Sequence, residues 1–247
     1  MTVAGQVDNA LSLVLGHDVF CVGASRTDAG VHSRAQAVHF DVPAELAALR
    51  PADWQQRWER DINKRLPMDI RVQNVCDAPP DFNAVVSAVG KMYSYRLHIA
   101  PDQPDPLCRL YCHVLPFGLR ERLNGSLSRL QEAANHLVGT HNFGYFANPD
   151  PSRPNRSSVK TIHSIRVVAD GPSRCRINVH LDAALYKMVR NIIGCIVAAA
   201  IDRFPYGTIS TLLESPPARD QRPRYFDTYP ANGLCLEQVY YARSVGF

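Results

Sequence analysis

The chain has 247 residues, of which 46% are hydrophobic and 20% are charged, and its formal net charge at pH 7 is +4. This length fits one large domain or two small ones, and the composition excludes a wholly disordered chain. The longest mostly apolar stretch, residues 192–201, is too short to cross a bilayer, and no charged start followed by an apolar run marks an export signal. We therefore expect an intracellular protein without membrane contact, cytoplasmic, or nuclear or organellar in a eukaryote.

Helical and extended patterns alternate in the first half of the chain. Apolar residues recur at helical spacing over residues 3–15 and 54–66, and Gly16 and Pro67 end the two runs. Short apolar or alternating runs predict strands between and after these helices, at residues 19–22, 35–42, 70–75 and 92–99. The order therefore mixes helices with strands, without a strand before the first helix.

A segment rich in proline, residues 101–118, separates this half from the next. We place the boundary at residue 112, with an N-terminal half at 1–112 and a C-terminal half at 113–247. The C-terminal half carries helical patterns and strand patterns in turn, with helices predicted at 127–137, 184–201 and 209–213 and strands at 159–168, 175–181 and 234–241. This predicts an α+β fold of two similar halves with mostly antiparallel sheets flanked by helices.

Positive charge is concentrated in the C-terminal half. Between Arg153 and Arg224 there are twelve Lys or Arg residues and five Asp or Glu residues, so the rest of the chain is net negative. Such a distribution is typical of a surface that binds a polyanion. A solvated face of a helix or sheet produces the same count, so charge alone leaves both interpretations open.

The seven cysteines are scattered along the chain, and without an export signal we expect them to be reduced. Cys108, Cys112 and His113 are close enough in sequence to be considered as metal ligands. A structural zinc site needs a second pair of ligands at a matching spacing, and the sequence has none. We therefore predict no metal site.

The most informative segment is GASRTDAGVH at residues 23–32, which follows a predicted strand. Its small residues allow a tight bend and the close approach of a large ligand. Asp28 in this loop could serve as a carboxylate nucleophile. An aspartate in a turn more often bonds its own loop backbone, and the residues alone leave both alternatives open.

The stretch RTDAGVH at residues 26–32 resembles the signature of the TruA-type tRNA pseudouridine synthases. Other segments match that family in its order: Asn63 with Leu66 and Pro67, FNA at 82–84, KMYSYR at 91–96, GTHNF at 139–143, LYKMVRNIIG at 185–194 and GLCL at 233–236. Together these segments cover nearly the whole chain. The resemblance implies the pseudouridine synthase fold and a homodimer in bacterial relatives.

The resemblance also implies a cofactor-independent isomerase that converts uridine to pseudouridine in the anticodon stem-loop of tRNA, around positions 38 to 40. Asp28 matches the catalytic aspartate, which attacks either C6 of the base or C1′ of the sugar. Arg190 matches the arginine that pairs with this aspartate, and Tyr93 matches the tyrosine that stacks on the target base. Arg26 matches the arginine that fills the space left by the flipped uridine. Further candidate contacts to the RNA are Thr27, Lys187, Arg156 and Lys160.

Periodicity alone gives these side chains plainer roles. Arg190 falls on the polar side of its predicted helix, where it would be solvated. Tyr93 alternates with Tyr95 on a predicted strand, so one of the two is expected to belong to the core.

One element of the family pattern, the opening strand with a Y-D-G…W-Q motif, is missing before Thr2. We expect the first half-sheet to lack that strand, which would leave backbone groups of its neighbour unpaired. The alternative hypothesis is therefore a non-catalytic RNA-binding protein that lost activity with this strand.

Overall fold

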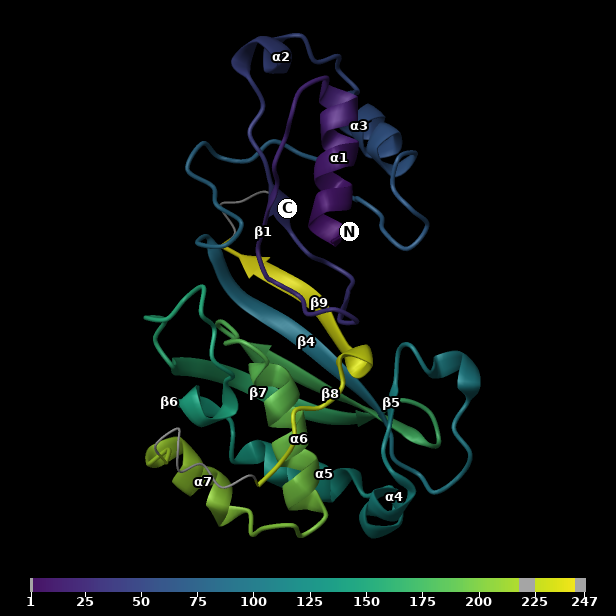
Figure 1. Cartoon of the computed structure of the whole chain (residues 1–247), viewed down its shortest axis with the longest axis vertical. Coiled ribbons are helices and arrows are strands. Elements are labelled where there is room, and N and C mark those ends of the chain that lie inside the picture. Colours follow the sequence, from purple (N-terminus) through teal and green to yellow (C-terminus); the bar gives the residue numbers. More distant parts are fainter. Residues whose placement is uncertain (1, 218–224, 243–247) are drawn as a thin grey trace. The chain divides into compact units, whose positions relative to one another are not determined.

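The computed structural model describes residues 2–217 and 225–242 (Figure 1). Contacts divide the chain into two compact units, of which unit 1 comprises the described parts of Met1–Arg26, Gln36–Ala88 and Tyr241–Phe247. Unit 2 comprises Thr27–Ala35 and the described parts of Val89–Tyr240. The contacts thus group residues 89–112 with the later part of the chain. The boundary between two halves at residue 112 stays a prediction.

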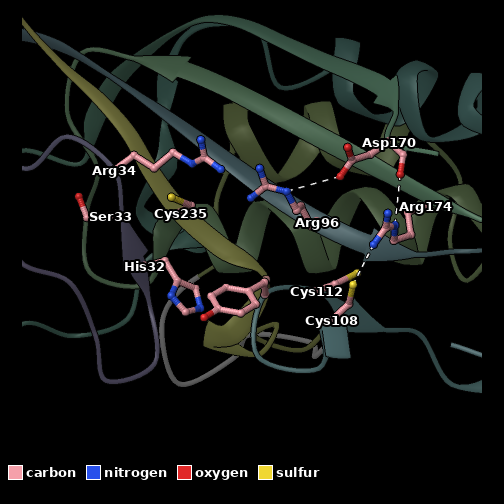
Figure 2. A pocket seen from close by; sticks show the side chains of 11 residues that line it. His32, Ser33, Arg34, Arg96, Cys108, Cys112, Asp170, Arg174 and Cys235 are labelled. Carbon is pink, nitrogen blue, oxygen red and sulfur yellow. Dashed lines mark hydrogen bonds and ion pairs between the residues drawn. The ribbon is translucent and has the colours of Figure 1, made fainter. Parts of the chain in front are cut away.

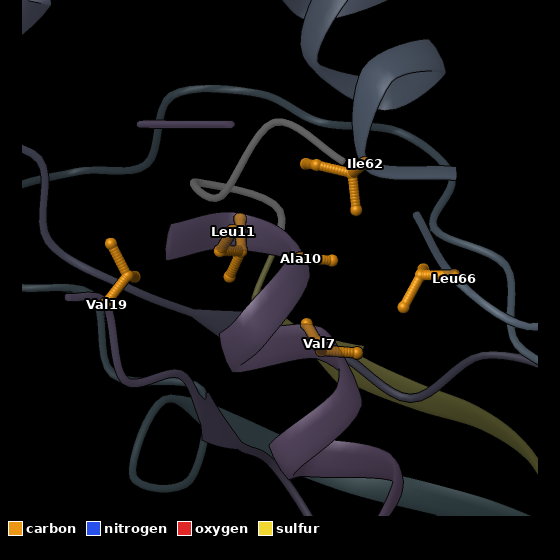
Figure 3. Close-up of a cluster of buried hydrophobic side chains, with 6 residues drawn as sticks. All are labelled: Val7, Ala10, Leu11, Val19, Ile62 and Leu66. Atoms are coloured by element: carbon orange, nitrogen blue, oxygen red, sulfur yellow. The ribbon is translucent and has the colours of Figure 1, made fainter. Parts of the chain in front are cut away.

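Two helices, α1 (Val3–Leu15) and α3 (Trp54–Asn63), form the centre of unit 1. Helix α1 begins where the Thr2 hydroxyl accepts a hydrogen bond from the Gly5 amide at 3.1 Å, and it ends at Gly16 with φ of 77°. Burial of apolar side chains holds the two helices together. Figure 3 shows this cluster, which consists of Val7, Ala10, Leu11, Val19, Ile62 and Leu66.

Strands are short in unit 1. Strand β1 (Val22–Gly23) pairs antiparallel with β3 (Val38–His39), followed by helix α2 (Ala44–Ala48). The prediction of a strand at residues 70–75 is wrong. The side-chain amide of Asn63 donates to the Val72 carbonyl and accepts from the Val72 amide, both at 2.8 Å. A side chain therefore satisfies backbone groups that a neighbouring strand would otherwise pair.

A seven-stranded sheet runs through unit 2 in the order β2-β9-β4-β8-β7-β6, with β5 paired to β4. Strands β2 and β9 are parallel, as are β4 and β5, whereas β4, β8, β7 and β6 pair antiparallel. The strands are β2 (His32–Ser33), β4 (Ala88–His98), β5 (His113–Val114), β6 (Gly139–Asn142), β7 (Val159–Ala169), β8 (Arg174–Leu181) and β9 (Leu234–Tyr241). The predicted α+β fold with a mostly antiparallel sheet is confirmed.

Helices flank this sheet (Figure 1). Helix α5 packs against β7 and α6, and α7 packs against β6. Alternate side chains of β8 are buried, as expected for a strand with one face covered. The helices of unit 2 are α4 (Phe117–Leu123), α5 (Leu127–Asn135), α6 (Met188–Ala200) and α7 (Gly207–Glu214), with short 3₁₀ turns η1 (Pro106–Cys108), η2 (Phe143–Phe146) and η4 (Ala231–Gly233).

Helix α6 begins later than predicted, because Lys187 adopts the left-handed conformation with φ of 57° and precedes the first helical residue. Every residue of this helix is buried except Arg190. A side chain that is the sole exception on a buried helix is a strong candidate for a specific contact. In the parts of the chain that the structure describes, no helix has the length and apolar character needed to cross a membrane.

Candidate active site

Asp28 lies on a loop, residues 27–35, that leaves unit 1 after Arg26 and returns to it at Gln36. Within unit 1, the Ala24 amide donates to the Ala37 carbonyl at 2.9 Å and joins the two flanks of this excursion. Within unit 2, the loop forms β2, which pairs with β9, and the Arg34 amide donates to the Leu236 carbonyl at 2.9 Å. Backbone hydrogen bonds thus hold the loop and its flanks.

A tight turn starts at Asp28. The Val31 amide donates to the Asp28 carbonyl at 3.0 Å, and Gly30, the third residue, has φ of 82°. Glycine adopts this conformation without steric cost, and its φ is the one that a type II turn requires. A Cβ on Gly30 would also lie 3.4 Å from the Ala231 Cβ. The backbone carbonyl of Asp28 closes the turn, and its carboxylate has a partner elsewhere.

That partner is Arg190 on helix α6. Arg190 Nη1 lies 2.6 Å from Asp28 Oδ2, and the two side chains are 15% and 26% exposed. The same guanidinium donates through Nε to the Tyr229 carbonyl at 2.6 Å, and the Tyr229 amide donates to the Arg190 carbonyl at 3.3 Å. Arg190 is therefore fixed by two acceptors, and its interpretation as a solvated residue is wrong.

Asn191, the next residue on α6, fixes the start of the helix. Its side chain donates to the Phe146 carbonyl at 2.8 Å and to Asn148 Oδ1 at 3.0 Å, and it accepts from Thr228 Oγ1 at 2.5 Å. An amide with partners on two other segments specifies their positions relative to α6. No role was predicted for Asn191 from the sequence. The signal available there was a polar residue between apolar ones, at the position next to Arg190.

Tyr95 supports the segment that holds Arg190. The side chain is fully buried, its hydroxyl donates to the Pro230 carbonyl at 2.7 Å, and its ring packs edge-on against Tyr229. Burial raises the pKa of Tyr95 well above its usual value, so it stays a neutral hydrogen-bond donor. Tyr93 is also buried, at 5% exposure. Burial therefore does not distinguish the two tyrosines.

Tyr93 differs from Tyr95 in its surroundings. Burial lowers the pKa of Arg156, which precedes β7, and the nearby Tyr93 side chain opposes this shift. Lys160, on β7, is 9% exposed, and its ammonium donates to the Val159 carbonyl at 2.8 Å. The structure thus brings Arg156 close to the predicted stacking residue, and Lys160 close to Arg156.

The remaining predicted contacts occupy three places. Thr27 is exposed and precedes Asp28 in the chain, and Arg26 is an exposed residue of unit 1. Lys187 precedes α6, with its Nζ 5.1 Å from the centre of the Tyr186 ring. The roles given to these residues stay predictions. Of the cationic residues counted in the sequence, Arg219, Arg222 and Arg224 lie outside the described residues.

Unit 2 also contains a cavity of about 440 Å³ that the Asp28–Arg190 pair does not line (Figure 2). Within it, Arg174 Nη1 lies 2.9 Å from Cys108 Sγ, and this thiol is 3.4 Å from Asp105 Oδ2. Among residues 2–217 and 225–242, no group of three or more His, Cys, Asp or Glu side chains is arranged to hold a metal ion.

A sequence model of a family described as tRNA pseudouridine synthase matches residues 133–242. Three curated relatives carry the name tRNA pseudouridine synthase A. The protein of Geobacillus kaustophilus is 35% identical over 97% of this chain and 85% of its own length. Those of Solidesulfovibrio magneticus and Moorella thermoacetica are each 33% identical, over 97% of this chain and 82% and 89% of their own lengths.

These relatives extend the match well beyond the residues of the family model, to the N-terminal segment that contains the Asp28 loop. The chain therefore belongs to the tRNA pseudouridine synthase A family.

Proposed function

We propose that this chain isomerises uridine to pseudouridine in tRNA, at positions 38 to 40 of the anticodon stem-loop, with Asp28 as the nucleophile. The observation that carries the proposal is the Asp28–Arg190 pair, in which a turn and a buried helix aim a carboxylate and a guanidinium at each other at 2.6 Å. The names of the relatives support tRNA as the substrate.

The reaction moves the base without changing its composition. The bond between N1 and C1′ breaks, a bond between C5 and C1′ forms, C5 loses its proton to solvent and N1 gains one. A carboxylate starts this sequence by attacking C6 of the base or C1′ of the sugar, and it is released when the new bond is complete. No electrons are gained or lost, so the proposed chemistry needs no cofactor.

Arg190 orients the nucleophile in this scheme. A charge-assisted hydrogen bond to Asp28 Oδ2 favours the ionised carboxylate and fixes its direction. The second hydrogen bond, from Nε to the Tyr229 carbonyl, prevents the guanidinium from following the carboxylate if it turns away. Orientation of this kind contributes to catalysis because the reacting atoms must already be close and aligned.

The target uridine must leave its stack before Asp28 can reach it, at a cost of a few kcal/mol. In the proposal, Tyr93 stacks on the extruded base and Arg26 fills the gap that it leaves. Thr27 and Lys187 contact the RNA beside the site, as do Arg156 and Lys160. We also propose that the chain assembles into a homodimer, because it resembles bacterial members of the family. Light scattering of the purified chain tests this.

Tritium release tests the function, because isomerisation must expel the hydrogen at C5. A tRNA transcript labelled at uridine C5 is expected to release tritium with the wild-type chain. The matched control is a transcript in which the uridines at positions 38 to 40 are replaced by cytidines, and it is expected to release none. Binding without release from the first transcript would support the non-catalytic alternative. Equal release from both would contradict the assigned positions.

Arg190→Lys is expected to lower the rate of tritium release by about 100-fold, because a single ammonium cannot reach both acceptors held by the guanidinium. The measurement is a single-turnover rate at saturating enzyme. Arg203→Lys is the control, since Arg203 is half exposed and lies 3.8 Å from Asp227. A rate for Arg190→Lys within threefold of wild type would contradict the orienting role.

A further inference from the structure

Lys91 is a buried cation to which the sequence assigned no role. It lies on β4 two residues before Tyr93 and is only 8% exposed. Side chains two residues apart on a strand share a face and are separated by about 7 Å. Lys91 therefore lies on the same face of the sheet as the residue proposed to stack on the target base.

The strand register brings a second buried lysine to this face. Lys91 on β4 and Ile162 on β7 both pair with Leu181 of β8, the strand between them. Lys160 precedes Ile162 by two residues, so it shares that face, and it is 9% exposed. Lys91, Leu181 and Ile162 thus form one row across the sheet, and Lys160 lies two residues further along β7 on the same face, so two buried lysines lie beside apolar side chains.

Further cations surround these lysines. Burial, together with the charges of Arg156 and Arg153, lowers the pKa of Lys91 to about 8. Burial and the charge of Arg156 also lower the pKa of Lys160. Asp182 opposes the shift of Lys160. Placing like charges close together is unfavourable for the folded protein on its own. A phosphate group of RNA placed among these cations would offset their mutual repulsion.

We propose that Lys91 and Lys160, together with Arg156, bind the backbone phosphate next to the target uridine. This inference rests on the proposed function, because it takes Tyr93 as the residue that stacks on the target base. A base and its flanking phosphate are joined through one sugar, and Lys91 and Arg156 both lie beside Tyr93. The phosphate contact positions the extruded nucleotide and carries no information about its sequence.

A double-mutant cycle between protein and RNA tests the contact. Binding is measured in the Asp28→Ala background, so that no reaction occurs, with a synthetic anticodon stem-loop. One arm carries Lys91→Met, which removes the charge and keeps an unbranched side chain. The other arm replaces single phosphates on either side of the target uridine by neutral methylphosphonates.

For one of these linkages, we expect neutralisation to weaken binding about tenfold with Lys91 and only about threefold with Lys91→Met, because Lys160 and Arg156 still contact that phosphate. The slope of log affinity against log salt is expected to fall by about 0.7 to 0.9, the value for one lost phosphate contact. Lys64→Met is the control, because Lys64 is exposed and paired with Asp61 on the surface of unit 1, and it should leave the slope unchanged. Lys91→Arg is expected to restore most of the slope.

If the affinity losses from Lys91→Met and from neutralising a phosphate are additive for every linkage, the phosphate site is overturned. If the wild-type chain still releases tritium in that case, the proposed function stands. Absence of tritium release by the wild type would instead overturn the proposed function. A cooperative melting transition of Lys91→Met shows that the variant is folded. If that transition is lost, the methylphosphonate series with wild-type Lys91 decides, and unchanged affinity for every neutralised linkage overturns the site.

The affinity of the wild-type chain for the stem-loop is also expected to fall between pH 7 and pH 9, and this fall should be reduced in Lys91→Met. The protonated lysine binds phosphate, and its pKa of about 8 in the free protein means that the charge is present below this pH and is lost above it. The variant removes the lysine and keeps the other ionisable groups nearby, which are Tyr93, Asp150, Arg153, Arg156, Lys160 and Asp182.

Discussion

Asp28→Asn is expected to abolish tritium release, with a loss of about 10⁴-fold or more, while the chain still folds and binds RNA. The amide keeps the size of the carboxylate and leaves the Val31 to Asp28 backbone hydrogen bond of the turn in place. It removes the proposed nucleophile, and substitution of such a group costs far more than that of a positioning residue. The measurement is the single-turnover rate on the labelled transcript, with affinity measured separately.

Asp77→Asn is the matched control for this substitution. Asp77 is also paired with an arginine, since Arg50 Nη1 lies 2.7 Å from its carboxylate, but it is 71% exposed and lies in unit 1. We expect it to retain the wild-type rate. A residual rate above one tenth of wild type in Asp28→Asn would show that this carboxylate is not the nucleophile.

Gly194→Ala is expected to destabilise the protein by about 3 kcal/mol. A Cβ on Gly194 would lie 2.1 Å from the Asp227 carbonyl oxygen and 3.1 Å from Tyr229 Cδ2, so either helix α6 or this segment must move. Because the Tyr229 carbonyl holds Arg190, the shift also disturbs the pair with Asp28. Activity is therefore expected to fall even at temperatures where the variant is folded.

Urea unfolding followed by circular dichroism measures this effect as a lower transition midpoint. The control is Gly118→Ala on helix α4, where nothing lies within 4 Å of the added Cβ. Alanine has the higher helix propensity, so this variant is expected to be as stable as the wild type or up to about 1 kcal/mol more stable. Equal midpoints for the two variants would contradict the close packing at Gly194.

Elements with local signals were predicted well. Helix α1 was recognisable because its apolar spacing and its terminal Gly16 lie within one short stretch of the chain. The start of α6 and the absence of a strand at 70–75 were not, because they depend on the conformation of Lys187 and on the side chain of Asn63. A strand pattern indicates which residues suit a sheet, but whether a neighbouring strand is available to pair with them depends on the rest of the fold.

The candidate site divides in the same way. The loop that carries Asp28 was recognisable from its small residues and from a family resemblance. The pairing with Arg190 joins residues 162 positions apart, so no spacing rule predicts it, and helical periodicity placed Arg190 in solvent. Lys91 was detectable in principle, because it shares the alternation of Tyr93 and Tyr95 and so belongs to the buried face. Alternation indicates which face of the strand Lys91 occupies, but it does not explain why a charged side chain is buried there.

The parallel ladder between β2 and β9 has a consequence for biosynthesis. It joins residues 203 positions apart, so the loop that carries Asp28 emerges early from the ribosome and obtains its sheet partner only when β9 has been made. Contacts over such separations form slowly, because a long loop must close before they are gained. A polypeptide released before residue 234 would lack the strand that pairs with the loop of the proposed nucleophile. Prematurely terminated translation products would consequently be unable to modify RNA, even with every candidate catalytic residue present.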